Sequence, residues 1–341
     1  MEKERLHYID IAKGLLILMV VYGHIDGTAT ELGFVNRAIE DIHRSVNIFV
    51  SFYMSCFFVI TGYCTNFKKS FPDFLISSIK SIILPAFVFS FVLSGAWNIS
   101  NPDAFIAFCK KFIMYGGDYW FLSALFLARL LFWVIERYPM TYVGIICSIS
   151  FILGFVLSSL PHEYEYWWFV HSLCLMPYLF IGKIIKEKNI FDRRKILITS
   201  LAYIFIFIVT VILSREGFLR KDCFFDVPGV TQGFININFT MFLPLVILSL
   251  IGSVAVLGVS RIISTNTVLE FLGKNSLVIY CVQGVVLHKI IAYISIFGAF
   301  ESDYWATLLL LLLSFILSVI VCSLISWIMN MKYIRYLLGK F

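Results

Sequence analysis

Ten apolar runs, separated by short polar intervals, follow one another along this chain. About 20 mostly apolar residues are enough to carry an α-helix across the hydrocarbon core of a bilayer, so the pattern predicts about ten spanning helices. We therefore expect an all-α, polytopic transmembrane helix bundle in a single domain over residues 1–341, with a short interfacial helix near 102–116. The predicted spans fall at 9–25, 46–66, 75–96, 118–136, 141–160, 167–185, 196–214, 235–258, 268–290 and 305–329.

The composition excludes an ordinary soluble protein. Of the 341 residues, 60% are hydrophobic and 14% are charged, whereas soluble domains are nearer 45–50% apolar and about 25% charged. The net charge of +6 is carried by short loops, so it reports membrane topology and predicts no nucleic-acid partner. The first apolar run contains charged residues and lacks a small-residue cleavage site, which favours a retained helix over a signal peptide. No Cys/His cluster has metal-ligand spacing, so we expect no metal site.

The loop charges predict the orientation of the bundle, because loops rich in Lys and Arg tend to stay in the cytoplasm. Basic residues gather in the intervals 183–195 and 66–74 and in the C-terminal tail. The interval 162–166 has no Lys or Arg, and 26–45 is rich in acids, so both are assigned to the outer face. With ten helices, both termini are cytoplasmic. We expect a multi-pass protein of the cell inner (plasma) membrane, in contact with membrane lipids.

The first apolar run carries Asp10, Lys13 and His24. Ionisable groups at membrane depth cost a few kcal/mol each and usually face an interior site. On a helix, Lys13 and His24 fall within about 20° of one face and about 16 Å apart along the axis, and Asp10 lies within roughly 40° of that stripe. The run therefore predicts a polar path, with Arg5, Asp10 and Lys13 near the inner face and His24 toward the outer face.

Each of these groups also has a structural interpretation. Lys13 can be a lysine that snorkels to the inner interface with Asp10 as its i,i+3 partner. The functional interpretation is that this cationic end binds an anionic or amide-rich ligand from the cytoplasm. A lone histidine near a helix end is often structural, but its near-neutral pKa also suits a general base. The face that His24 shares with Lys13 favours the functional interpretation.

Later segments add weaker candidates. Gly62 stands in a bulky run, which indicates a close backbone approach or a helix break. Trp120 fits an interfacial aromatic belt, or else an aromatic wall for a sugar or an acyl chain. Asn275 is placed to cap a helix, and Tyr280 and Gln283 lie three residues apart on one side of that helix and are expected to face the bundle. The segment 162–171 combines carboxylates with aromatic rings, which is typical of an interfacial belt and also of carbohydrate contact.

Four short motifs, in order along nearly the whole chain, resemble the acyltransferase-3 family of integral-membrane acyltransferases, particularly its branch resembling fucose acetylases. They are Ile9-Asp10-x-x-Lys13-Gly14 with Val21-Tyr22-Gly23-His24, Phe57-Phe58-x-Ile60-x-Gly62-Tyr63, Trp120-Phe121-Leu122, and Phe271-x-Gly273-Lys274-Asn275-Ser276-x-x-Ile279-Tyr280. Each motif is weak alone, and together they are fairly specific.

The resemblance implies about ten helices around a central pore, an acyl-coenzyme A donor that enters from the cytoplasm, and an acceptor hydroxyl reached from the membrane or the outer side. Lys13 matches the donor-contacting basic residue of the family, and His24 matches its catalytic histidine. This chain departs from the family at two positions, Tyr53 and Gln283, where related sequences often have histidine. If either histidine is needed for the chemistry, this protein uses another residue in its place, accepts a different substrate, or is inactive.

Together these features predict an O-acyltransferase that moves an acyl group, most simply acetyl from acetyl-CoA, to a cell-surface or lipid-linked glycan. His24 is the expected catalytic base, and Lys13 with Arg5 and Asp10 would bind the donor. The expected substrate-binding residues are Tyr53, Trp120, Asn275, Tyr280 and Gln283. The main alternative is a transporter or flippase for a polysaccharide or a lipid-linked sugar, whose conduction path the same polar stripe would line. A membrane binding module without turnover is a third possibility.

Overall fold

A computed structural model of the chain describes residues 6–50, 52–95, 97, 102–158, 166–188, 239–296, 303–332 and 334–339. These residues form α-helices with short 3-10 and π-helical segments, and the described part of the chain contains no strand. The chain divides into two compact units that interleave along the sequence. Unit 1 comprises Met1–Phe57, Phe191–Phe224 and Phe239–Ile328, and unit 2 comprises Phe58–Ile190, Phe225–Asn238 and Met329–Phe341.

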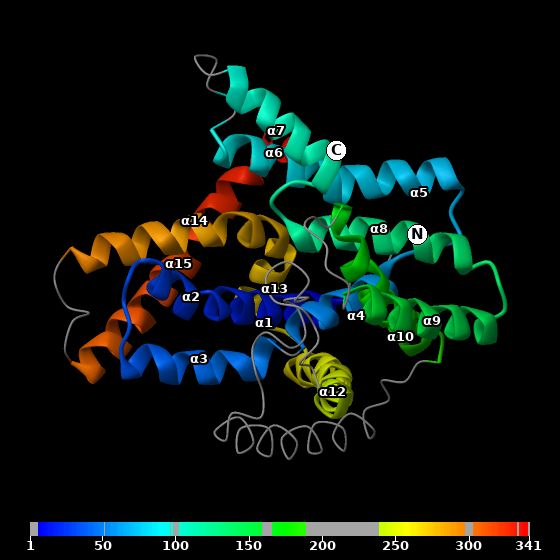
Figure 1. Cartoon of the computed structure of the whole chain (residues 1–341), viewed down its shortest axis with the longest axis horizontal. Helices are drawn as coiled ribbons and strands as arrows, with labels where there is room; N and C mark the ends of the chain where they lie inside the picture. The colour runs from blue at the N-terminus through cyan, green and yellow to red at the C-terminus, as the bar shows by residue number, and fades with distance from the viewer. Residues whose placement is uncertain are drawn as a thin grey trace. The chain divides into compact units, whose positions relative to one another are not determined.

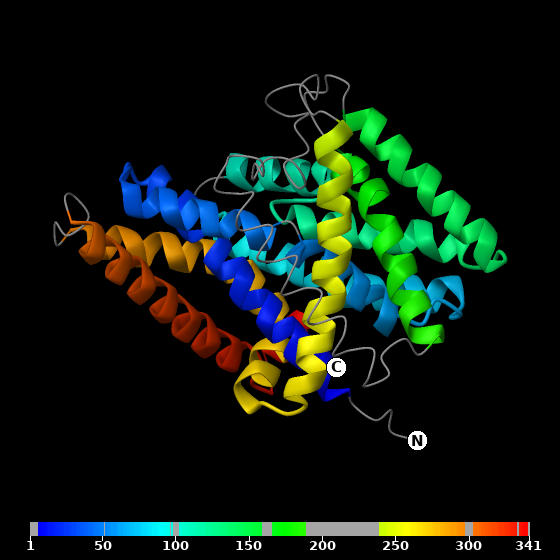
Figure 2. The ribbon, with the colours of Figure 1, turned by 90° about the horizontal axis from the view of Figure 1, so that it is seen from below.

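Unit 1 contains the first helix and those packed around it. In it, α2 lies between α3 and α14 (Figure 1). The short α13 lies at the foot of α12 and packs against the first turns of α1 (Figure 2). The helices of unit 1 are α1 (His7–Gly23), α2 (Ile25–Glu31), α3 (Arg37–Val50), the start of α4 (Tyr53–Cys64), α12 (Phe239–Ile263), α13 (Thr267–Lys274), α14 (Ser276–Ser295) and α15 (Tyr304–Met329).

Unit 2 is built around α8, which packs against α10 and against the π-helical segment η1. Gly62 of α4 and Gly182 of α10 bring these two helices into backbone contact, because a Cβ on either would lie 2.0 Å from a carbonyl oxygen of the other helix. The close approach predicted at Gly62 is thus confirmed, and α4 runs through it without a break. Besides the rest of α4, unit 2 has α5 (Phe71–Ser78), η1 (Ile79–Ile83), α6 (Leu84–Leu93), α7 (Pro102–Tyr115), α8 (Trp120–Ile135), α9 (Met140–Ser158), η2 (Tyr166–Trp168), α10 (Phe169–Glu187) and η5 (Arg335–Leu338).

Seven helices of the described part are long and apolar enough to span a membrane, and the pair α7 and α8, bent by 40°, makes an eighth candidate. The all-α, polytopic bundle is therefore confirmed. The helix expected near 102–116 is present as α7. The expected span 196–214 lies outside the described residues, so the count of ten stays a prediction, as do the cytoplasmic termini and the single domain.

Two expected spans differ in the structure. The run 46–66 is not one helix, because α3 ends at Val50 and α4, with 12 residues, begins at Tyr53. The run 268–290 is divided at Asn275 into the eight-residue α13 and the spanning α14. Residues 46–61 contain no Gly or Pro, so hydropathy alone had no signal for the first break. The acidic interval 26–45, assigned to the outer face, is largely helical as α2 and α3.

Candidate functional site

The N-terminal half of α1 is held against α13 by two reciprocal glycines. A Cβ on Gly14 would lie 2.1 Å from the carbonyl oxygen of Leu269, and a Cβ on Gly273 would lie 1.7 Å from the carbonyl oxygen of Asp10. Small residues allow helices in membranes to approach backbone to backbone. These glycines explain why the first and last motifs, far apart in sequence, meet in unit 1 next to Asp10 and Lys13.

Lys13 lies half-buried on α1, and the neighbouring Asp10 is 7% exposed. Among the described residues the Lys13 ammonium forms no ion pair. A half-buried cation without an internal counter-ion is costly in a membrane bundle. The arrangement therefore favours the functional interpretation of Lys13, in which an anionic ligand supplies the missing charge.

The start of α1 is fixed to α13 by a small charge cluster. His7 donates from Nδ1 to Oε2 of Glu270 at 2.9 Å, and Nζ of Lys274 donates to the same oxygen at 3.2 Å. The hydrogen bond from His7 holds the pKa of Glu270 below its usual value, and Lys274 adds to the effect. On the opposite side, the guanidinium of Arg261 in α12 lies 5.0 Å from the centre of the Tyr8 ring. These contacts clamp the end of α1 between α12 and α13.

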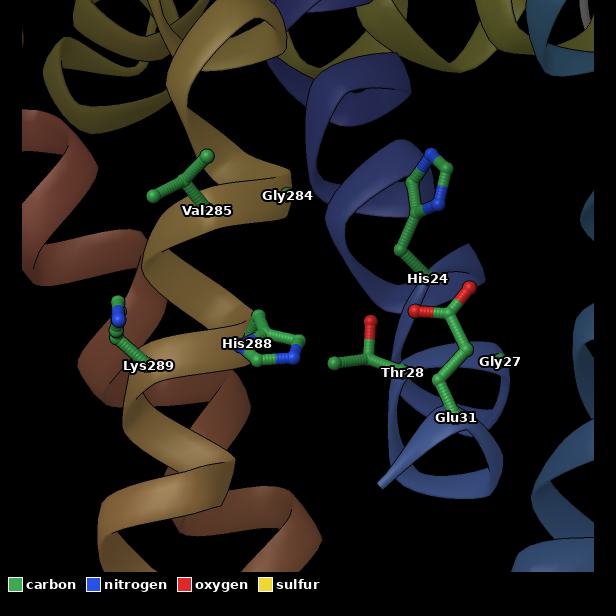
Figure 3. A pocket seen from close by; sticks show the side chains of 8 residues that line it. All are labelled: His24, Gly27, Thr28, Glu31, Gly284, Val285, His288 and Lys289. Carbon is green, nitrogen blue, oxygen red and sulfur yellow. The ribbon is translucent and has the colours of Figure 1, made fainter. Parts of the chain in front are cut away.

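At its other end α1 passes into α2 at His24, which is exposed and lines a cavity of about 420 Å³. His24, Thr28 and Glu31 project from the α1–α2 side, and His288 points across the cavity from α14 toward Thr28 (Figure 3). The lining residues are His24, Gly27, Thr28 and Glu31 on one side and Gly284, Val285, His288 and Lys289 on the other. The first four stand at i, i+3, i+4 and i+7, so they share one helical face.

Two glycines widen this cavity. A Cβ built on Gly27 or on Gly284 would meet nothing within 4 Å. Glycine in a helix interior costs roughly 0.5–1 kcal/mol relative to alanine. Neither position needs glycine for helix contact, in contrast with Gly14 and Gly273. Gly27 and Gly284 thus leave open space between His24 and His288, which is where a substrate group would fit.

The opposite face of α2 is pinned to α3. His43 donates from Nδ1 to Oδ2 of Asp26 at 2.6 Å, and Asp26 is 2% exposed. Tyr22, near the end of α1, forms a second link to α3 through a 2.6 Å hydrogen bond with Ser45. Because Asp26 follows His24 by two residues, it points to the other side of the helix. The two links hold α2 so that the face carrying His24 is turned toward α14.

Among the described residues, the others predicted for unit 1 do not line the cavity. Tyr53 is buried, and its hydroxyl would lie 3.3 Å from a Cβ at Gly23, so it packs beside the residue that precedes His24. Asn275 lies at the start of α14, but its side chain donates back to the carbonyl oxygen of Phe271 at 2.8 Å instead of capping the helix as expected. Tyr280 and Gln283 are half-buried and buried, and neither lines the cavity. Arg5 lies outside the described residues.

Trp120 belongs to unit 2, where it forms a three-ring cluster. Its ring centre lies 5.3 Å from that of His171 and 6.1 Å from that of Trp168, and the last two are 5.0 Å apart. Trp120 is half-buried, and His171 is buried. Part of the segment singled out for carbohydrate contact, residues 162–165, lies outside the described residues.

The sequence interpretation missed the residues that share the cavity with His24. Thr28 and Glu31 were overlooked because the interval 26–45 was treated as a loop. His288 was overlooked because α14 was expected to act through Tyr280 and Gln283. The signal was nevertheless present, since the spacing 24, 27, 28 and 31 continues one helical face beyond the predicted end of the first helix. On α14 the imidazole in the cavity comes from His288, five residues after Gln283.

The chain is similar in sequence to a known protein family and to a nodulation protein. Residues 6–327 match the family described as Acyltransferase domain. The nodulation protein NolL of Mesorhizobium japonicum is 23% identical over 297 residues, which cover 81% of this chain and 75% of NolL. No solved structure matches the chain.

Proposed function

The chain belongs to the Acyltransferase domain family, and from this premise we propose that it is a multi-pass membrane O-acyltransferase of the inner membrane. Its donor is cytoplasmic acyl-CoA, most simply acetyl-CoA, and its acceptor is a hydroxyl of a cell-surface or lipid-linked glycan. The observation that carries the proposal is that His24 faces a cavity with a second histidine, on the same helix as a half-buried Lys13 without a counter-ion among the described residues.

His24 acts as the general base. Its imidazole accepts the proton of the acceptor hydroxyl while that oxygen attacks the thioester carbonyl carbon. The C–S bond breaks, an ester C–O bond forms, and the proton passes on to the coenzyme A sulfur as the thiol leaves. General-base catalysis of this kind contributes about 10²–10⁴-fold. The exposed ring of His24 is compatible with a base that reaches an incoming hydroxyl.

Lys13 binds the donor at the inner end of the same helix. The helical rise places it about 16 Å from His24 along the axis, a length comparable to a pantetheine arm. Asp10, buried one helical turn before Lys13, belongs to the same donor site, and Arg5 is proposed to add a second positive charge. The thioester then lies along α1 with its acyl group toward His24.

The cavity supports a polar acceptor. Thr28, Glu31 and Lys289 offer hydrogen-bonding groups around it, and volumes of 300–1,000 Å³ are typical of small-molecule sites. The cluster of Trp120, Trp168 and His171 in unit 2 is the kind of aromatic surface on which sugar rings stack. We assign Tyr53 of α4, Tyr280 and Gln283 of α14, and Asn275 at the N-cap of α14 to shaping the acceptor site, since all four belong to unit 1.

The test uses purified protein in liposomes with acetyl-CoA labelled in the acetyl group and a surface-glycan extract as acceptor. His24→Ala is expected to lower label transfer about 10²–10⁴-fold. Its unfolding temperature is expected to equal that of the wild type. Thr30→Ala is the matched control, because Thr30 is exposed on the same α2 but does not line the cavity. Sugar movement across the liposome without any acyl donor would instead establish the transporter, and donor binding without turnover would establish a binding module.

A further inference from the structure

Arg129 of α8 lies among apolar groups of unit 2 without an ionic partner in the described part of the chain. Its guanidinium carbon is 5.4 Å from the centre of the Phe74 ring on α5. Its Nε is buried and has no hydrogen-bond partner among the described residues. The nearby acids are engaged elsewhere, because Glu136 binds Lys183 at 2.9 Å and Asp73 accepts a hydrogen bond from Ser70.

Ser78 carries a second unsatisfied group, on the helix that holds Phe74. It follows Phe74 by one helical turn, so it stands on the face of α5 that Phe74 turns toward Arg129. Its side chain is fully buried, and its Oγ has no hydrogen-bond partner within the described residues. The π-helical turn η1 begins at the next residue and packs against α8. Single π-helical turns inside α-helices are frequently found at functional sites.

Arg129 is half-buried with its Nε buried and unpartnered among the described residues, and the Ser78 hydroxyl is fully buried without a partner there. An unsatisfied buried polar group costs free energy, and a charge inside a membrane bundle is retained mainly where it meets a ligand or a counter-ion. The ring of Phe74 attracts the guanidinium as a cation–π partner but does not replace a hydrogen-bond acceptor. A ligand with a negative charge and several oxygen atoms would satisfy both groups, because it would accept hydrogen bonds from the Arg129 guanidinium and from the Ser78 hydroxyl.

We propose that Arg129 and Ser78 form a binding site for a phosphate group, supplied either by the soluble donor or by a phospholipid headgroup. A guanidinium binds phosphate through two parallel N–H donors, and the Ser78 hydroxyl donates to a further oxygen. Phe74, whose ring centre lies 5.4 Å from the guanidinium carbon, packs beside this site. The inference does not depend on acyl transfer, since it concerns binding within unit 2.

The test measures binding to protein in a maltoside detergent and phosphate-free buffer, by thermal unfolding during titration. Coenzyme A is compared with pantetheine, which lacks phosphate, and phosphatidylglycerol is compared with diacylglycerol. Arg129→Gln is expected to weaken binding of coenzyme A or of phosphatidylglycerol about 10- to 100-fold, the range for charge-assisted hydrogen bonds. Ser78→Ala is expected to weaken it by about 3- to 10-fold. The arm that responds identifies the source of the phosphate.

Arg137→Gln is the matched control, because Arg137 also lies on an aromatic ring, 4.1 Å from the centre of Trp133, just beyond the end of α8. Equal losses for Arg129→Gln and Arg137→Gln, or wild-type affinity of Arg129→Gln for both phosphate probes, would overturn the proposal. Arg129→Met separates a ligand site from a structural one. Without phosphate it should be at least as stable as the wild type, and a lower unfolding temperature there would show that Arg129 has an internal partner instead.

Discussion

The contact between α1 and α13 makes a sharp prediction for Gly273→Ala. The new Cβ would stand 1.7 Å from the carbonyl oxygen of Asp10, and real Cβ atoms essentially never approach closer than 3.0 Å. The two backbones must therefore separate by about 1.3 Å at this point. Backbone atoms cannot rotate away as a flexible side chain can. We therefore expect Gly273→Ala to lower the free energy of unfolding by at least about 1–3 kcal/mol, the cost that is typical when a packed core is overfilled.

Gly14→Ala tests the same contact from the other helix, with 2.1 Å between its Cβ and the carbonyl oxygen of Leu269. Each single variant should unfold at lower SDS concentration than the wild type, followed by tryptophan fluorescence in mixed micelles. The double variant should lose less than the sum of the two single losses, because one separation of the helices relieves both clashes. Coupling between residues in contact is typically 0.5–3 kcal/mol.

Gly27→Ala is the stability control, since nothing lies within 4 Å of its Cβ. It should be neutral or stabilising by up to about 1 kcal/mol, because alanine favours helix more than glycine does. The reasoning is refuted if Gly273→Ala unfolds at the same SDS concentration as Gly27→Ala. Strict additivity of Gly14→Ala and Gly273→Ala would refute the claim that one shared helix separation accounts for both.

Three further predictions concern charged and titratable groups. His288→Ala should lower acyl transfer, because the His288 imidazole points into the cavity that His24 lines; wild-type transfer by this variant would exclude His288 from the reaction. Glu270 has a lowered pKa, so its contribution to stability is complete above the ordinary pKa of a carboxyl group and is lost as the pH falls toward the lowered pKa. Glu270→Gln should therefore make the free energy of unfolding less dependent on pH in this acidic range, as measured by unfolding between acidic and neutral pH. Lys183→Met leaves the nearly buried Glu136 without its 2.9 Å partner and should cost about 3–5 kcal/mol, most of which Glu136→Leu should restore.

Hydropathy located most helices of the described part within a few residues, because apolar runs of spanning length have few alternatives in a bilayer. The predicted 305–329 appears as Tyr304–Met329, and 141–160 appears as Met140–Ser158. Hydropathy failed where a helix is interrupted inside an apolar run, between α3 and α4 and at Asn275. Such interruptions arise from contacts with other helices, which a local average over residues does not contain.

The candidate site was predicted only in part. His24 and Lys13 stood out from the sequence because charged groups in an apolar run are unusual and because the helical repeat puts them on one face. Glu31 continues that face, but the end of the apolar run hid it. His288 could not be assigned to the same cavity from the sequence, because the distance between α2 and α14 depends on how the helices pack.

Residue polarity and helical periodicity were sufficient to predict the class of this protein, the approximate positions of its helices and the polar stripe on the first of them. These are local properties, set by residue polarity and by the repeat of the helix. The packing of the helices was needed to establish that Gly14 and Gly273 meet and that His288 faces the cavity of His24. Contacts between segments more than 200 residues apart are selected by packing, which no local pattern in the chain records.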